Sequence, residues 1–210
     1  NDLSAGVGLT ASDFSMCSIS LRLTPKGMAQ RDYVLSLVWQ YISLVKSTVE
    51  NNTELMEQFH EELRQMSETY FRFRENGDPT DFCSGAADLL HDFPPEKLLV
   101  GSSIPGPYNE TVAKAFLDRL RPDNCIVNIQ NSDFEEGGEG EHECNASSAP
   151  WQYEKWYKAK YREVQIGESL QDKWSTSKEI DSRLHVPAMN TFLPTDFSLR
   201  ADDPESQKSY

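Results

Sequence analysis

The sequence predicts an α+β fold, in which a mixed β-sheet carries helices packed on one face. Two short segments with strand character, residues 13–23 and 125–129, are separated by a long interval with helical periodicity. Two such strands belong to one sheet, because the helices between them can cover its apolar face. An extended C-terminal segment is expected from residue 176 onward, where Pro187 and Pro194 disfavour helix.

The first predicted strand shows a clear alternation. Every second residue is apolar, and Ser18, Ser20 and Arg22 alternate with the apolar set Cys17, Ile19, Leu21 and Leu23. A period of two is typical of a strand with one buried face. Thr24 and Pro25 then predict a helix start, with the hydroxyl as cap and the proline at the first helical position.

The helical interval is predicted from apolar stripes and from stop signals. The clearest stripe lies between residues 52 and 74, where apolar side chains recur every three or four positions: Leu55, Phe59, Leu63, Met66, Tyr70 and Phe73. A helix that starts at about residue 25 is expected before this segment. Gly77 and Pro79 are expected to end the helix over residues 52–74. Further helices are expected over 80–91 and after Pro107.

Composition narrows the function classes. The chain has 210 residues and a formal net charge of −14. This charge disfavours nucleic acid and anionic membrane surfaces as partners, because both are recognised by clustered Lys and Arg. An acidic field would instead attract basic peptides. A charged surface that only keeps the protein in solution is the plainer alternative.

The cysteines predict a reduced, cytoplasmic protein. Four of them are widely spaced without a Cys-x-x-Cys pair: Cys17, Cys83, Cys125 and Cys144. No apolar run approaches the roughly 20 residues that span a bilayer. The chain starts at Asn1 without a methionine or a targeting pattern, as expected for a piece of a longer polypeptide.

No metal site is expected from the histidines. His60 is followed by Glu61 and Glu62, but a zinc-binding pair on a helix needs a second His about one turn away, and Met56 and Arg64 occupy those positions. The remaining histidines, His91, His142 and His185, are isolated. His142 and Cys144 are ligand types but have no second pair nearby, and no nucleophile elbow or phosphate loop is present.

Two further segments have alternative interpretations. Residues 131–150 form an acidic loop, which could steer cationic peptides or could be a solvated insertion. The aromatic residues near the C-terminal side are interpreted as core or inter-domain packing rather than a nucleic-acid stacking platform, because the chain carries a large net negative charge. These are Trp151, Tyr153, Trp156, Tyr157, Tyr161 and Trp174.

Several short motifs occur together in one order. They are Phe14 to Thr24, Trp39-Gln40-Tyr41-Ile42, Phe71-Arg72-Phe73, Leu120-Arg121-Pro122-Asp123-Asn124, Trp156-Tyr157 and Leu193-Pro194-Thr195-Asp196-Phe197. In this order they resemble zinc metallopeptidases of the pitrilysin family, of the insulysin and nardilysin type. The similarity extends over most of the chain, although the acidic loop is longer than in insulysin.

The resemblance implies a large enzyme of two halves, each with two α+β domains, which enclose a chamber where oligopeptides are cut. Residues 1–175 would be most of the non-catalytic second domain, without its first strand and helix, and residues 176–210 the start of the linker between the halves. The zinc ligands would lie upstream of Asn1, so the full-length enzyme would use zinc but this chain would be inactive alone. Its partners would be peptide substrates and the remaining domains.

The resemblance also indicates a substrate-binding site. The six residues Leu3, Ser4, Ala5, Gly6, Val7 and Gly8 resemble an edge strand that captures substrate by strand addition, where small residues let another backbone approach. Locally, a glycine-containing start could equally be a flexible loop. Two alternatives stay open: a non-catalytic structural subunit on the same fold, and an acidic peptide-binding module.

Overall fold

A computed structural model of the chain describes residues 2–11, 13–131, 150–175 and 179–198. The contacts group into two compact units. Unit one comprises residues 1–47 and 112–186, and unit two comprises residues 48–111 and 187–210. Most of the acidic loop lies outside the described residues, and with it His142 and Cys144.

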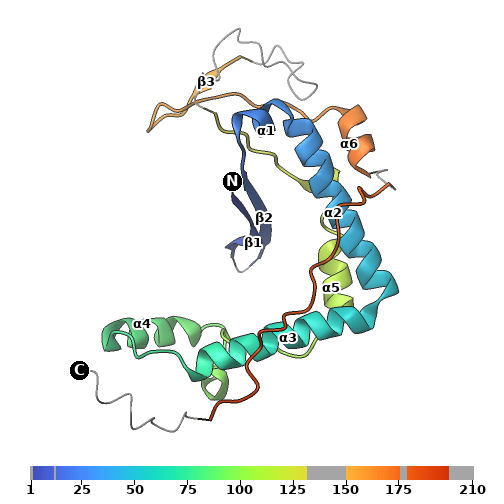
Figure 1. The fold of residues 1–210 in the computed structure, drawn as a ribbon. Helices are drawn as coiled ribbons and strands as arrows, with labels where there is room; N and C mark the ends of the chain where they lie inside the picture. The colour runs from blue at the N-terminus through green and yellow to red at the C-terminus, as the bar shows by residue number, and fades with distance from the viewer. Residues whose placement is uncertain (1, 12, 132–149, 176–178, 199–210) are drawn as a thin grey trace, which may run out of the picture. The chain divides into compact units, whose positions relative to one another are not determined.

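Unit one begins with a β-hairpin (Figure 1). Strands β1 (Asp2–Thr10) and β2 (Ser15–Arg22) pair antiparallel, with Leu3 opposite Leu21 and Val7 opposite Cys17. The strand predicted at 13–23 is therefore confirmed. The expectation that one face of this strand is buried is wrong, because every residue of β2 except Leu21 is exposed. No helix or other strand of the described residues packs extensively on the hairpin.

The core of unit one is built around two tryptophans. Helix α1 (Pro25–Ala29) follows the hairpin, capped by Thr24, whose hydroxyl accepts a 3.1 Å hydrogen bond from the Gly27 N–H. Helix α2 (Arg31–Asn51) carries Trp39, which stacks on Trp174 of helix α6 (Glu168–Ser175) with 5.9 Å between ring centroids. The buried or partly buried residues around this pair are Leu35, Ile42, Cys125, Val127, Ile166 and Leu170.

The predicted mixed sheet is not formed in the part of the chain that the structure describes. Residues 125–129 follow the 3-10 turn η2 (Pro122–Asn124) in extended form but pair with no strand. Cys125 and Val127 pack against the tryptophan core through their side chains instead. The sheets are two antiparallel pairs, β1 with β2 and β3 (Gln152–Tyr153) with β4 (Lys160–Tyr161). Helices with small antiparallel sheets still make an α+β chain.

The aromatic segment packs only in part. Trp174 is buried, as predicted, whereas Trp156 is 76% and Tyr157 91% exposed. The Glu154 carboxylate explains the exposure, because it accepts hydrogen bonds from the backbone N–H groups of both residues and so holds a tight turn at the surface. The expectation of core packing is therefore wrong for the exposed residues Tyr153, Trp156, Tyr157 and Tyr161, for which packing between domains stays a prediction.

Unit two is mainly helical. Helix α3 (Thr53–Arg72) starts at Asn52, whose side-chain oxygen accepts from the Leu55 N–H at 3.2 Å. Helix α4 (Pro79–Leu89) starts at Asp78, which accepts from the Thr80 N–H at 2.7 Å. The 3-10 turn η1 (Pro95–Lys97) and the start of helix α5 (Glu110–Leu117) follow, and α5 continues into unit one. The two predicted helices over 52–74 and 80–91 are confirmed.

The C-terminal segment is extended and anchored. The described residues 179–198 contain no helix or strand. In unit one, the Asp181 N–H donates to the Gln40 side-chain oxygen at 3.0 Å, and Arg183 pairs with Asp181 at 2.6 Å. In unit two, Phe197 stacks on Phe73 with 5.4 Å between ring centroids. None of the helices described here combines the length and apolar character needed to cross a membrane.

Candidate peptide-binding edge

The six residues predicted to bind substrate all lie on β1, and all are exposed. β1 pairs with β2 along one edge, and no strand of the described residues pairs along its other edge. In an antiparallel pair, alternate residues direct their backbone N–H and C=O groups away from the partner strand. Such an edge can accept another extended backbone.

The hairpin has two chemically different faces. Leu3, Ala5 and Val7 lie opposite Leu21, Ile19 and Cys17, and these six side chains define the apolar face. Leu3 is 66% and Val7 70% exposed. Ser4 and Gly6 lie opposite Ser20 and Ser18, and these four residues define the small face. The two faces follow directly from the period of two along each strand.

A bulge interrupts the pairing at Gly8. The register shifts between Val7 and Leu9, so that Leu9 lies opposite Met16. A Cβ atom at Gly8 would lie 2.8 Å from the Ser18 Cβ, which is closer than real side chains approach. At Gly6 an added Cβ would meet nothing within 4 Å. The close approach of Ser18 thus requires a glycine at position 8, while the space over Gly6 on its face of the hairpin is open.

An apolar pocket lies at the start of β1. Its cavity volume is about 340 Å³, and three leucines supply its apolar lining: Leu3, Leu21 and Leu23. Asp2 and Arg22, which lie opposite each other in the hairpin, add one residue of each charge sign to the lining. Gly27 and Thr24 at the beginning of α1 complete the lining. Leu21 and Leu23 are not among the predicted site residues, although the apolar alternation through Leu23 is the sequence signal for this pocket.

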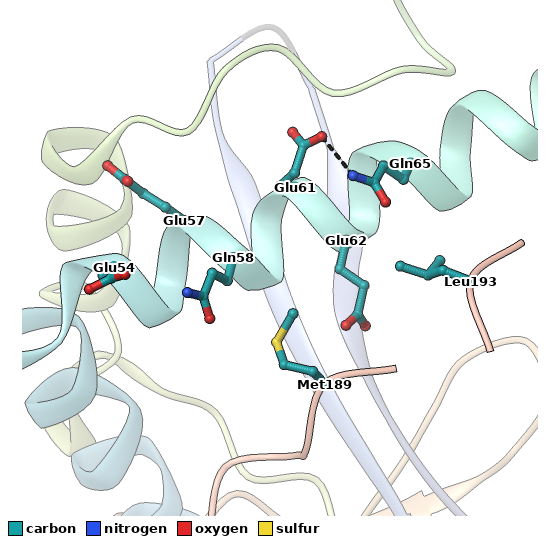
Figure 2. A pocket seen from close by; sticks show the side chains of 8 residues that line it. All are labelled: Glu54, Glu57, Gln58, Glu61, Glu62, Gln65, Met189 and Leu193. Atoms are coloured by element: carbon teal, nitrogen blue, oxygen red, sulfur yellow. Dashed lines mark hydrogen bonds between the residues drawn. The ribbon is translucent and has the colours of Figure 1, made fainter. Parts of the chain in front are cut away.

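Unit two contains a second hollow, between α3 and the C-terminal segment, with a volume of about 440 Å³. Figure 2 shows that Glu62 and Gln58 point toward Met189, whereas Glu57 and Glu61 point away from it. Arg64 pairs with Glu61 at 2.8 Å, and its hydrogen bonds, with a further one from Gln65, lower the pKa of Glu61 to about 2. The lining contains four glutamates, of which Glu61 and Glu62 accept hydrogen bonds from groups of the protein itself.

The described histidines, His60, His91 and His185, do not assemble a metal centre. The ring Nε2 of His60 donates to the carbonyl oxygen of Gly106 at 2.7 Å, and its ring lies beside Tyr108. His185 Nδ1 lies 3.0 Å from the carbonyl oxygen of Val186. Across residues 2–11, 13–131, 150–175 and 179–198, no three His, Cys, Asp or Glu residues come together as metal ligands. These residues therefore do not fit a zinc ion.

Comparison with known proteins identifies the class. Residues 71–210 match the family model described as the middle or third domain of peptidase M16. The chain belongs to the M16 peptidase family, which confirms the resemblance to insulysin- and nardilysin-type enzymes.

Similar proteins extend this match over nearly the whole chain. Insulin-degrading enzyme-like 1, peroxisomal, of Arabidopsis thaliana is 31% identical over 97% of this chain and 19% of its own length. Human nardilysin is 26% identical over 93% of the chain and 16% of its own length. The Drosophila melanogaster insulin-degrading enzyme is 25% identical over 98% of the chain and 19% of its own length. The chain thus spans about a fifth or less of these relatives.

Proposed function

We propose that the chain is the substrate-binding, non-catalytic part of a zinc metalloendopeptidase that degrades oligopeptides inside an enclosed chamber. The edge of β1 along which no strand of the described residues pairs, in a chain of the M16 family, carries this proposal. Residues 3–8 would hold an extended peptide by strand addition. Residues 1–175 would serve as the second domain and 176–210 as the linker between the halves, in a cytoplasmic enzyme.

Strand addition suits an enzyme that accepts many peptides. Affinity comes from main-chain hydrogen bonds, which every peptide can offer, while side-chain contacts add selectivity. The exposure of every residue of β1 supports close approach of a second backbone. The net charge of −14 would speed the encounter with basic peptides at low ionic strength.

The cutting chemistry would come from the rest of the polypeptide. A peptidase zinc ion supplies an activated water and polarises the scissile carbonyl. The described residues provide no ligand set for it. The role left to this chain is to bind one part of the peptide and hold it in an extended conformation while another part reaches the zinc.

Backbone methylation of the peptide tests this proposal without altering the protein. A peptide with alternate amides N-methylated loses two or three hydrogen bonds to the β1 edge, each worth about 1 kcal/mol. We expect the affinity for the whole polypeptide that carries this chain to fall by roughly 10- to 100-fold. Methylation of the other alternate set, which faces away from β1, is the matched control. Equal binding of the methylated and unmethylated peptides would exclude strand addition.

The reading frame upstream of Asn1 separates the peptidase from a structural subunit on the same fold. A His-x-x-Glu-His motif with a downstream Glu is expected there. If the motif is absent, the chain belongs to a non-catalytic protein, even though β1 could still bind peptides.

A further inference from the structure

Resting on the proposed strand addition, we propose that the bulge at Gly8 limits the length of peptide that β1 can pair with. The six residues Asp2–Val7 would bind an extended peptide segment, whatever its side chains, and Leu9 and Thr10 would not take part. The rest of the peptide would leave the sheet at the bulge. Gly8 is the residue that sets this limit.

The register of the hairpin locates the bulge. From the start of β1 to Val7, each residue lies opposite one residue of β2. Val7 lies opposite Cys17, and the next paired residue, Leu9, lies opposite Met16. β1 therefore advances by two residues where β2 advances by one, and Gly8 is the extra residue.

The extra residue reverses the alternation along β1. Cys17 and Met16 are neighbours in a regular strand, so their side chains lie on opposite faces of the hairpin. Their partners Val7 and Leu9 therefore also lie on opposite faces, although residues two apart in a regular strand share one face. The backbone groups alternate with the same period. The residues that direct N–H and C=O groups away from β2 thus change from one parity to the other at Gly8.

A regular peptide strand can match only one of the two segments of β1. Its own N–H and C=O groups alternate without interruption, so a peptide in register with residues 2–7 cannot also be in register with Leu9 and Thr10. To continue, the peptide would need a bulge of its own at the same place, with one residue left unpaired. The hydrogen bonds beyond Gly8 are then not made, and the peptide gains little affinity by following the edge.

The bulge is fixed in its place along the strand. At Gly8, an added Cβ would lie 2.8 Å from the Ser18 Cβ, so the residue that lies against Ser18 has to be a glycine. Moving the bulge by one residue would put a neighbour of Gly8 there, and both neighbours have a Cβ. The turn after β1 is closed by a 2.8 Å hydrogen bond from the Ala11 N–H to the Phe14 carbonyl oxygen, which holds the register of the strand ends. The limit is therefore built into the hairpin.

The footprint of a bound peptide, meaning the set of β1 amides whose exchange it slows, tests the limit. The whole polypeptide that carries this chain is saturated with an Ala, Ser and Lys peptide of about twelve residues, enough to span the nine residues of β1. Mass spectrometry with electron-transfer fragmentation measures amide exchange at single residues and checks that the peptide stays intact. In residues 2–7, the amides that face away from β2 should exchange at least about tenfold more slowly with the peptide bound. Leu9 and Thr10 should exchange at unchanged rates, and slowing of either one would overturn the inference.

Deletion of Gly8 tests the cause of the limit. The deletion joins Val7 to Leu9, so that every remaining residue of β1 lies opposite one residue of β2 through Thr10. The footprint should then extend to whichever of Leu9 and Thr10 faces away from β2. Gly6→Ala is the matched control, because its Cβ meets nothing within 4 Å and the register is kept, so its footprint should stay at residues 2–7. An unextended footprint in a deletion variant whose β2 amides stay protected would overturn the role of the bulge.

These measurements separate the length limit from the proposed function. If the peptide binds but slows none of the outward-facing amides in residues 2–7, strand addition at β1 is wrong and the limit is wrong with it. If the footprint covers the whole of β1 in the parent protein, strand addition stands and only the limit is wrong. If deletion of Gly8 unfolds the hairpin, seen as fast exchange throughout β2, the footprint on the parent protein decides by itself.

Discussion

The side-chain carboxylate of Glu62 accepts a 2.7 Å hydrogen bond from the backbone N–H of Asn190, a residue 128 positions further along the chain. This contact holds the C-terminal segment against α3 within unit two. Phe197 adds a second anchor through its stack on Phe73, with Arg72 over its ring. A segment predicted only as an extended tail is therefore part of a compact unit.

Removing the Glu62 carboxylate should release this segment. A hydrogen bond to a charged acceptor that is partly buried is worth about 1 to 2 kcal/mol. We expect Glu62→Ala to speed amide hydrogen exchange of residues 187–193 roughly tenfold, measured by mass spectrometry. The Glu57 side chain points away from Met189 in this segment, so Glu57→Ala should leave this exchange unchanged. Unchanged exchange in Glu62→Ala would show that the Glu62 hydrogen bond is not needed to hold the segment on α3.

Truncation of the core tryptophan should destabilise unit one strongly. Trp174 is 2% exposed and stacks on Trp39, so Trp174→Ala leaves a cavity that costs about 3 to 5 kcal/mol. Trp156→Ala removes a side chain that is 76% exposed and should cost less than about 0.5 kcal/mol. Urea unfolding followed by tryptophan fluorescence compares the two. Similar midpoints for both variants would contradict the core assignment.

Gly8 should be the least replaceable residue of the hairpin. Gly8→Ala places a Cβ against Ser18 and should cost about 1 to 3 kcal/mol of hairpin stability. Gly6→Ala, where the space is open, should be nearly neutral. Amide exchange of β2 reports the difference. Ser18→Gly in the Gly8→Ala background should restore protection, and failure of this rescue would place the strain elsewhere.

The ion pair on α3 should weaken with acid. Hydrogen bonds from Arg64 and Gln65 lower the pKa of Glu61 from 4.5 to about 2. A lowered pKa means that the contribution of Glu61 to stability is full above the unfolded value, near pH 4.5, and is lost as the pH falls toward 2. NMR titration of the Glu61 carboxyl carbon should give a midpoint near 2, and Arg64→Met should return it toward 4.5. An unshifted midpoint in the parent protein would show that the pair is not formed in solution.

The chain alone should not cleave peptides. Its described residues contain no metal-ligand set, and the proposed function places the zinc elsewhere in the polypeptide. Incubation of the 210-residue chain with zinc and a quenched fluorescent peptide should give the same rate as buffer with zinc. Zinc-dependent turnover that disappears with a chelator would refute the division of roles proposed here.

The sequence by itself determined the elements whose signals are local. Asn52 and Asp78 mark helix starts because their side chains bond to backbone N–H groups two or three residues away. The alternation in residues 13–23 defined β2, and the ordered motifs were enough for the family. The proposed binding strand was identified by resemblance rather than by its own pattern, because a stretch containing Gly6 and Gly8 has little strand propensity.

Only the tertiary structure decided which distant surfaces meet. Residues 125–129 have a strand pattern, yet they cover the Trp39 and Trp174 core and pair with no strand in the described chain. The leucine pocket needs the hairpin end beside α1, and the Glu62 bond needs a segment from far along the chain. Caps and periodicity act over a few residues, whereas these contacts depend on which apolar and polar groups remain uncovered once the local elements have formed.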